Sequence, residues 1–225
     1  MKNNLNGMRT YLVGAMDRVP DRGTQWRERV TQPLHDMGVK VINPCQKPVY
    51  SVKETDETLS VINDYKATGQ YDRLKKEFAV IRNADLRCVD ISDFIIAHID
   101  VDVHACGTYE EIVTANRQKK PVLVNCVQGK QNAPNWLFFM LPHRHIFSSM
   151  DEVLEHLTMI NEDHRPYDLK RWFFFEDSIV NATATKKSTS DSTHARLGCA
   201  SMFRRTIHAV GIAHRSYIAY IYQGI

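Results

Sequence analysis

Two adjacent glutamates follow a Gly-Thr pair in residues 105–115, ACGTYEEIVTA. The stretch is typical of a loop that becomes a helix, and Thr108 with Glu111 matches the capping box, in which a glutamate reaches back to the amide of the cap residue. A carboxylate in the first helical turn also lies near the positive end of the helix dipole, which favours the ionised form that a nucleophile needs. Local sequence permits either role for Glu111. Glu110 points about 100° away and is expected to face solvent.

Apolar runs and amphipathic stretches alternate along most of the chain. Because strands alternate with helices, the expected fold class is α/β: a three-layer sandwich with a five-stranded parallel sheet in flavodoxin-like or Rossmann-like order. The polar residues 45–70 predict a long excursion that can carry part of a site. The predicted strands are 9–14, 39–44, 93–99, 121–126 and a short one after 145, and the predicted helices are 25–38, 71–89, 107–120 and a Ser-capped helix within 148–160.

Loops after the strands should form a crevice, because ligands of an open parallel sheet bind at the carboxyl ends of its strands. Within these loops, Arg18, Arg22 and Arg27 can clamp a phosphate through forked hydrogen bonds, or simply be solvated. The loops are GAMDRVPDRG (14–23), NPCQKP (43–48), DVDVHACGTYEE (100–111) and NCVQGKQNAPNW (125–136), and the other residues expected to bind substrate are Gly14, Met16, Gly107 and Asn132.

Three motifs, in this order and spacing, resemble the nucleoside 2-deoxyribosyltransferase family and its relatives that hydrolyse nucleoside 5′-monophosphates. The likeness covers residues 9 to about 160. The motifs are TYLVGAM, NADLRCVDISDFIIAHID and GTYEEIVTANRQKKPVLV. The resemblance implies that Glu111 attacks the anomeric carbon of the sugar, that Asp85 protonates or positions the base, and that Tyr11 orients the nucleophile. It also implies a retaining mechanism, in which a covalent glycosyl ester is released to a second base or to water.

The chain departs from the family pattern at several positions. Ala105 stands where transferases carry an aspartate, and we take Asp102 as a substitute for its contact with the sugar. Val113 replaces an expected glycine. The motif GTYEE also resembles the cytokinin-activating phosphoribohydrolases, although the preceding VHAC lacks their Pro-Gly-Gly cradle. A protein that binds or sequesters a nucleotide without turnover is a further alternative, favoured by Ala105.

Composition bounds the remaining expectations. A formal charge of +3 is too balanced for a nucleic acid polymer as partner. The five cysteines include no CxxC pair and the histidines no metal-ligand spacing, so we expect reduced thiols, a cytoplasmic location, no metal and no cofactor. Neither an export signal nor a membrane span is evident. The expected partners are a nucleoside or nucleotide, a free nucleobase and further copies of this chain, since loop residues reach a partner's site in the family.

The chain is expected to comprise an α/β domain and a C-terminal extension. Residues 1–177 form the domain, residues 178–195 a Ser/Thr-rich linker with little to bury, and residues 196–225 a basic and apolar tail. Residues 136–139, WLFF, are expected in the core or at a subunit interface rather than stacked on a base.

Overall fold

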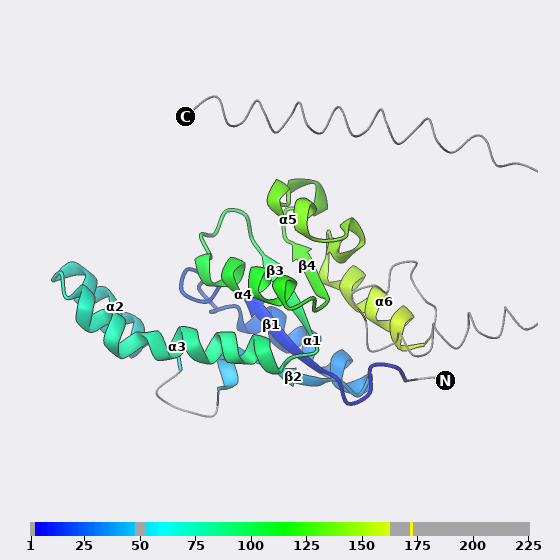
Figure 1. Ribbon diagram of the computed structural model, residues 1–225, viewed down its shortest axis with the longest axis horizontal. Coiled ribbons are helices and arrows are strands. Elements are labelled where there is room, and N and C mark those ends of the chain that lie inside the picture. Colours follow the sequence, from blue (N-terminus) through cyan, green and yellow to red (C-terminus); the bar gives the residue numbers. More distant parts are fainter. Residues whose placement is uncertain (1–2, 48–52, 163–171, 173–225) are drawn as a thin grey trace, which may run out of the picture. The chain divides into compact units, whose positions relative to one another are not determined.

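A five-stranded parallel sheet organises the computed structural model, which describes residues 3–47, 53–162 and 172. Its strand order is β2-β1-β3-β4-β5, so the predicted α/β class and flavodoxin-like order are confirmed. Figure 1 shows the strands with helices on both sides. The elements are β1 (Arg9–Gly14), α1 (Thr24–Asp36), β2 (Lys40–Ile42), α2 (Asp56–Ala67), α3 (Tyr71–Ile91), β3 (Phe94–Ile99), α4 (Cys106–Arg117), β4 (Val122–Cys126), α5 (Asn135–Met140), β5 (Ile146–Phe147) and α6 (Met150–Asn161), with single 3-10 turns at Pro44–Gln46, Lys130–Asn132 and His143–His145.

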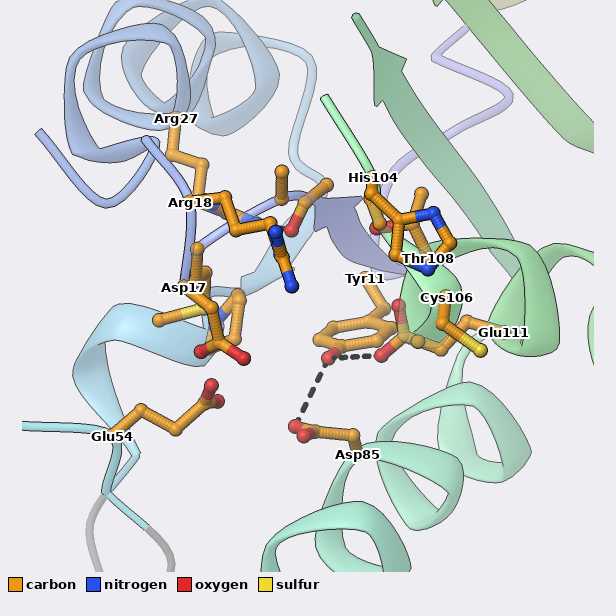
Figure 2. Close-up of a pocket in the computed structure, with 16 residues that line it drawn as sticks. Tyr11, Asp17, Arg18, Arg27, Glu54, Asp85, His104, Cys106, Thr108 and Glu111 are labelled. Atoms are coloured by element: carbon orange, nitrogen blue, oxygen red, sulfur yellow. Dashed lines mark hydrogen bonds between the residues drawn. The ribbon is translucent and has the colours of Figure 1, made fainter. Parts of the chain in front are cut away.

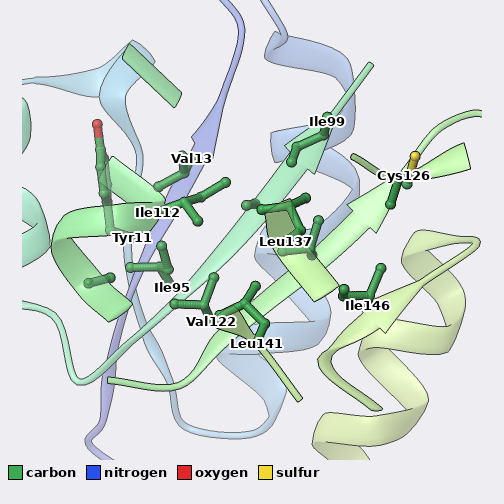
Figure 3. Packing of buried hydrophobic residues seen from close by; sticks show 14 of the residues in the cluster. Tyr11, Val13, Ile95, Ile99, Ile112, Val122, Cys126, Leu137, Leu141 and Ile146 are labelled. Atoms are coloured by element: carbon green, nitrogen blue, oxygen red, sulfur yellow. The ribbon is translucent and has the colours of Figure 1, made fainter. Parts of the chain in front are cut away.

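Alternation along β1 sends neighbouring side chains to opposite faces of the sheet. Tyr11 and Val13 belong to a core packed under α3, α4 and α5, whereas Leu12 belongs to a core packed under α1 and α6. Figure 3 shows Ile112 of α4 directed toward Val13 and Ile95. Because side chains alternate along β1, Tyr11 lies on the face of the sheet that α4 covers.

Helix α2 lies within the polar segment for which no conformation was predicted. Thr55 caps it by accepting a hydrogen bond from the amide of Thr58 at 3.2 Å, and Asp56 and Glu57 stand in its first turn. The helix buries none of its side chains. The apolar stripe that is the main sign of a helix in sequence is therefore weak here. The predicted Ser cap of the last helix is confirmed, because Ser149 accepts from the amide of Glu152 at 3.2 Å.

The stretch WLFF divides between core and surface. Leu137 is buried in the core below α5, whereas Trp136 and Phe139 are 70% and 75% exposed and form an edge-to-face pair. A core position is therefore wrong for these two rings, and a subunit interface stays a prediction. The predicted linker and tail, residues 178–225, lie outside the described residues, as does the domain boundary at 177.

No helix in the described part of the chain is long and apolar enough to cross a membrane.

Candidate active site

A cavity of about 270 Å³ opens at the carboxyl ends of β1 and β3, bordered by the start of α4. Figure 2 shows the side chains that line it. A side chain on Gly107 would meet no atom within 4 Å, so the glycine leaves this space open. Of the residues predicted from the sequence, the structure brings together Tyr11, Gly14, Met16, Arg18, Asp85, Gly107 and Glu111.

The hydroxyl of Tyr11 links two carboxyl groups at the floor of the cavity. It lies 2.8 Å from Oε1 of Glu111 and 3.1 Å from Oδ1 of Asp85. Burial, followed by the charges of Glu111 and Asp85, raises the pKa of Tyr11 well above its ordinary value. The hydroxyl therefore keeps its proton and acts as the donor that fixes the orientation of Glu111.

Glu111 is 8% exposed, and its environment disfavours the charged form. Burial raises the pKa of Glu111 from 4.5 to about 8; the hydrogen bond from Tyr11 opposes this shift, and the charge of Asp85 adds to it. The group is thus a carboxylic acid at neutral pH and becomes a carboxylate only in mildly alkaline solution.

The start of α4 corrects the capping-box prediction. The helix begins at Cys106 after Ala105, whose side chain makes no cap hydrogen bond, and Thr108 is a buried residue inside the first turn. Glu111 therefore falls in the second turn and binds Tyr11 instead of the cap amide. Its expected first-turn position and dipole-favoured ionisation are both wrong, because the helix starts two residues before Thr108 and the side chain points into the protein.

Lys47 and Glu54 join this cluster, and neither was predicted from the sequence. The ammonium group of Lys47, 5% exposed, lies 2.6 Å from Oδ1 of Asp85 and 3.2 Å from Oε1 of Glu54. Burial lowers the pKa of Lys47, but its contacts with Asp85 and Glu54 outweigh burial and leave the pKa raised. Lys47 is therefore a charged link between the two carboxyl groups. The positions of Lys47 and Glu54 in a polar loop gave no sign of this contact.

The three arginines of the first loop have different surroundings. Arg27 is fully buried and donates to the backbone carbonyls of Leu12 and Gly14, among others, so it supports the loop from within. Arg22 binds the backbone carbonyl of Glu54 and the carboxylate of Asp56. Arg18 is exposed at the cavity wall and pairs with no described residue. Only Arg18 keeps its guanidinium available to an anion in the cavity.

Asp102 and Asn132 lie outside the cavity lining. Both contact Gln128: its side-chain amide donates to Asp102 at 3.1 Å, and Asn132 donates to its backbone carbonyl at 2.6 Å. Their predicted contacts with a substrate find no support in this geometry. The substitution of Asp102 for the aspartate missing at Ala105 therefore stays a prediction, whereas Ala105 itself lines the cavity.

A second cavity, of about 370 Å³, adjoins the first between α2, α3 and α4. Its apolar wall is formed by Ile62, Phe78, Ile81 and Leu86, and charged side chains, among them Arg82 and Glu110, line the rest. Four acidic residues line both cavities, Asp17, Glu54, Asp85 and Glu111, so the two spaces meet at the carboxyl cluster. The arrangement offers a polar chamber and an apolar chamber, with a potential nucleophile at their junction.

Comparison with protein-family models and with curated protein sequences gives no match to this chain. Solved structures with a similar fold include a 2-deoxyribosyltransferase from the psychrotolerant bacterium Bacillus psychrosaccharolyticus, at 16% identity and a TM-score of 0.44, covering 65% of this chain and 90% of that one. A 2-desoxiribosyltransferase from Leishmania mexicana is similar at 18% identity and a TM-score of 0.38, covering 54% and 66%. A CMP N-glycosidase from Clostridium botulinum is similar at 18% identity and a TM-score of 0.38, covering 68% and 98%. These similarities assign no activity to this chain.

Proposed function

We propose that the protein cleaves the N-glycosidic bond of a nucleoside, a deoxynucleoside or its 5′-monophosphate, and passes the sugar to another base or to water. The observation that carries this proposal is the contact of Glu111 with Tyr11 and, through the same hydroxyl, with Asp85 at the meeting point of two cavities. A buried carboxyl group in a cleft, with a strongly raised pKa, is typical of a catalytic residue.

Glu111 is the proposed nucleophile. Once ionised, it attacks the anomeric carbon from the face opposite the base, and the glycosidic bond breaks as the ester bond forms. Tyr11 holds the attacking carboxylate in place by its hydrogen bond of 2.8 Å. Attack by water or a second base on the same carbon then releases Glu111, so two displacements retain the configuration of the sugar.

A phosphate on the sugar is the form of substrate that the cavity favours. Arg18 offers a guanidinium with no carboxylate partner among the described residues. The free amides at the start of α4 are further donors for an anion. A nucleoside 5′-monophosphate would use both, whereas a nucleoside would leave them to water.

Product analysis distinguishes this proposal from its alternatives. The protein is incubated with deoxynucleosides and with nucleoside 5′-monophosphates, with and without a different free base, and the mixtures are separated by chromatography. Base exchange identifies a transferase, release of free base identifies a hydrolase, and an unchanged ligand that nevertheless binds would favour a sequestering protein.

Trapping tests the covalent step itself. A substrate whose sugar carries a 2-fluoro group slows the release of a glycosyl ester, and mass spectrometry of the digested protein then locates the adduct. We expect the added mass of the sugar on the peptide that contains Glu111. Turnover without any adduct, or an adduct on another residue, would contradict the assignment of Glu111.

A further inference from the structure

Glu54 occupies the junction of the two cavities and has no role in the mechanism described above. It lines both the polar and the apolar chamber, as Asp85 and Glu111 do. The apolar chamber suits a planar base, and the polar chamber, with Arg18, suits a sugar phosphate. A substrate that spans both chambers would place its glycosidic bond beside these three carboxyl groups.

The side chain of Glu54 is held in place but not fully occupied. Oε1 accepts a hydrogen bond from Lys47 at 3.2 Å, and Oε2 contacts no described residue. Arg22 binds the backbone carbonyl of Glu54 and so fixes the segment that carries it. Figure 2 shows the carboxyl groups of Glu54 and Asp85 directed toward the same space from opposite sides. One oxygen of Glu54 is therefore available to a ligand there.

Asp85 and Glu54 differ in the donors that surround them. Oδ1 of Asp85 receives the ammonium of Lys47 at 2.6 Å and lies 3.1 Å from the hydroxyl of Tyr11. An oxygen held this closely by an ammonium group is suited to accept hydrogen bonds and unsuited to give a proton. Glu54 has only the longer contact with Lys47. Burial raises the pKa of Glu54; Lys47 opposes the shift, and the charges of Asp85 and Asp17 add to it.

We propose that Glu54 is the general acid that protonates the departing nucleobase, while Asp85 positions the base as a hydrogen-bond acceptor. This inference rests on the proposed function. As an oxygen of Glu111 bonds to the anomeric carbon, the carbon–nitrogen bond breaks and its electron pair stays on the base. The proton moves from the carboxyl group of Glu54 to a ring nitrogen or oxygen of the base. Glu54 is left as a carboxylate beside the ammonium of Lys47, which stabilises the new charge.

The second displacement reverses these roles. Water attacks the anomeric carbon, the ester bond to Glu111 breaks, and Glu111 recovers the electron pair as a carboxylate. Glu54 takes the proton of the attacking water and returns to its starting form. The cycle needs no other proton donor and no cofactor.

A leaving group that needs no proton provides the test. Guanine nucleotides methylated at N7 carry a fixed positive charge on the base, and 7-methylguanine departs as a neutral molecule without protonation. We compare kcat/KM, which reports the steps through base release and not the second displacement, on GMP and dGMP with kcat/KM on their N7-methylated forms, subtracting spontaneous base loss. The variants are Glu54→Gln, Asp85→Asn and Glu111→Gln, and Glu57→Gln is the matched control because Glu57 is an exposed acid of the same segment.

Glu54→Gln should lower kcat/KM on the unmethylated nucleotides by at least about a hundredfold and change kcat/KM on the methylated ones by less than about threefold. Retained activity on the methylated nucleotides also shows that the variant folds. Glu111→Gln should lose both activities, and Glu57→Gln should keep both. Equal losses on both substrates in Glu54→Gln, or selective rescue in Asp85→Asn instead, would overturn the proposal. Wild-type protein that releases base from neither of these substrates, nor from any nucleoside or nucleotide in the product analysis above, would refute the proposed function, and the role of Glu54 with it.

Discussion

The two faces of α4 carry glutamates that are neighbours in sequence and opposites in environment. Glu110 is 38% exposed and forms an ion pair with Arg82, whose hydrogen bond holds the pKa of Glu110 below its ordinary value. Glu111, on the inner face, is 8% exposed and has its pKa raised to about 8. Both belong to one helix and stand at nearly the same distance from its positive end, so the helix dipole cannot explain the difference.

Burial explains the difference in pKa, because its effect on the free energy of ionisation exceeds that of the helix dipole. A shift of one pKa unit corresponds to about 1.4 kcal/mol, and the pKa of Glu111 moves from 4.5 to about 8. A helix dipole at low ionic strength contributes only about 0.3 to 1 kcal/mol to a nearby charge. Glu111 thus differs from Glu110 because protein covers its carboxyl group. The charge of Glu110 is instead stabilised by the exposed Arg82.

The largest expected effect comes from removing the inner carboxylate. Glu111→Ala should lower kcat/KM by at least about a thousandfold, since the proposed covalent step then has no nucleophile. Glu155→Ala, a matched control at an exposed glutamate of α6 that lines neither cavity, should stay within about threefold of wild type. Steady-state kinetics with circular dichroism to verify the fold measures both. More than a few per cent of activity in Glu111→Ala would show that the nucleophile is another group.

Substitutions of Asp85 and Tyr11, which lie beside Glu111, should give intermediate effects. The larger effect is expected at Asp85. Asp85→Asn keeps the size of the side chain but removes the charge that binds Lys47 and that, in the proposed mechanism, faces the base. We expect kcat to fall by about tenfold to a hundredfold while ligand binding, measured by calorimetry, persists. Asp72→Asn removes an exposed acid from the same helix and serves as the control. Unchanged kinetics in Asp85→Asn would count against any role at the base.

The effect of Tyr11 on the pKa of Glu111 can be measured through the pH dependence of kcat/KM. Because Glu111 must lose its proton to attack, wild-type kcat/KM should rise with pH until about 8. The hydrogen bond from Tyr11 lowers the pKa of Glu111, so Tyr11→Phe should move the rising limb to higher pH and reduce the rate about tenfold at neutral pH. Tyr71→Phe, at an exposed site on α3, should leave the profile in place. An unshifted limb in Tyr11→Phe would mean that another group controls it.

The smallest expected effect is on stability. The folded pKa of Glu111 lies above its ordinary 4.5, so its protonated form favours folding, and that contribution is lost as pH rises from 4.5 through about 8. Glu111→Gln removes this penalty, and the melting temperature should exceed that of wild type by several degrees above about pH 8. The two proteins should melt alike near pH 4. A destabilised Glu111→Gln at alkaline pH would imply that the folded protein stabilises the charged carboxylate.

The strands were predictable because each is encoded locally. The runs RTYLVG, FIIAHI and VLVNC are predominantly apolar, as is typical of strands covered on both faces, and their boundaries agree with the structure within about two residues. Helix α2 gave no comparable sign because it buries none of its side chains. The start of α4 was misplaced because a Thr-x-x-Glu pattern fits a capping box whether or not the chain uses it.

The site was predictable only in part. The spacing of the family motifs brought Glu111, Asp85 and Tyr11 to attention, and the structure gathers these three. Lys47 and Glu54 escaped notice because each lies in a polar loop, and the contact of Lys47 with Asp85 joins residues far apart in the sequence. Arg22 illustrates the reverse error: its charge suggested a phosphate clamp, but the guanidinium is occupied by the segment around Glu54.

The sequence by itself determined the order of strands and helices and the identity of the acidic residues, because hydrophobic periodicity and side-chain chemistry are local properties. The tertiary structure alone decided which of those acids is buried, which cation lies beside it and which hydroxyl binds it. Protonation and reactivity depend on desolvation and on charges a few ångströms away. Those distances exist only after β1, α3, α4 and the loop that carries Lys47 have packed together.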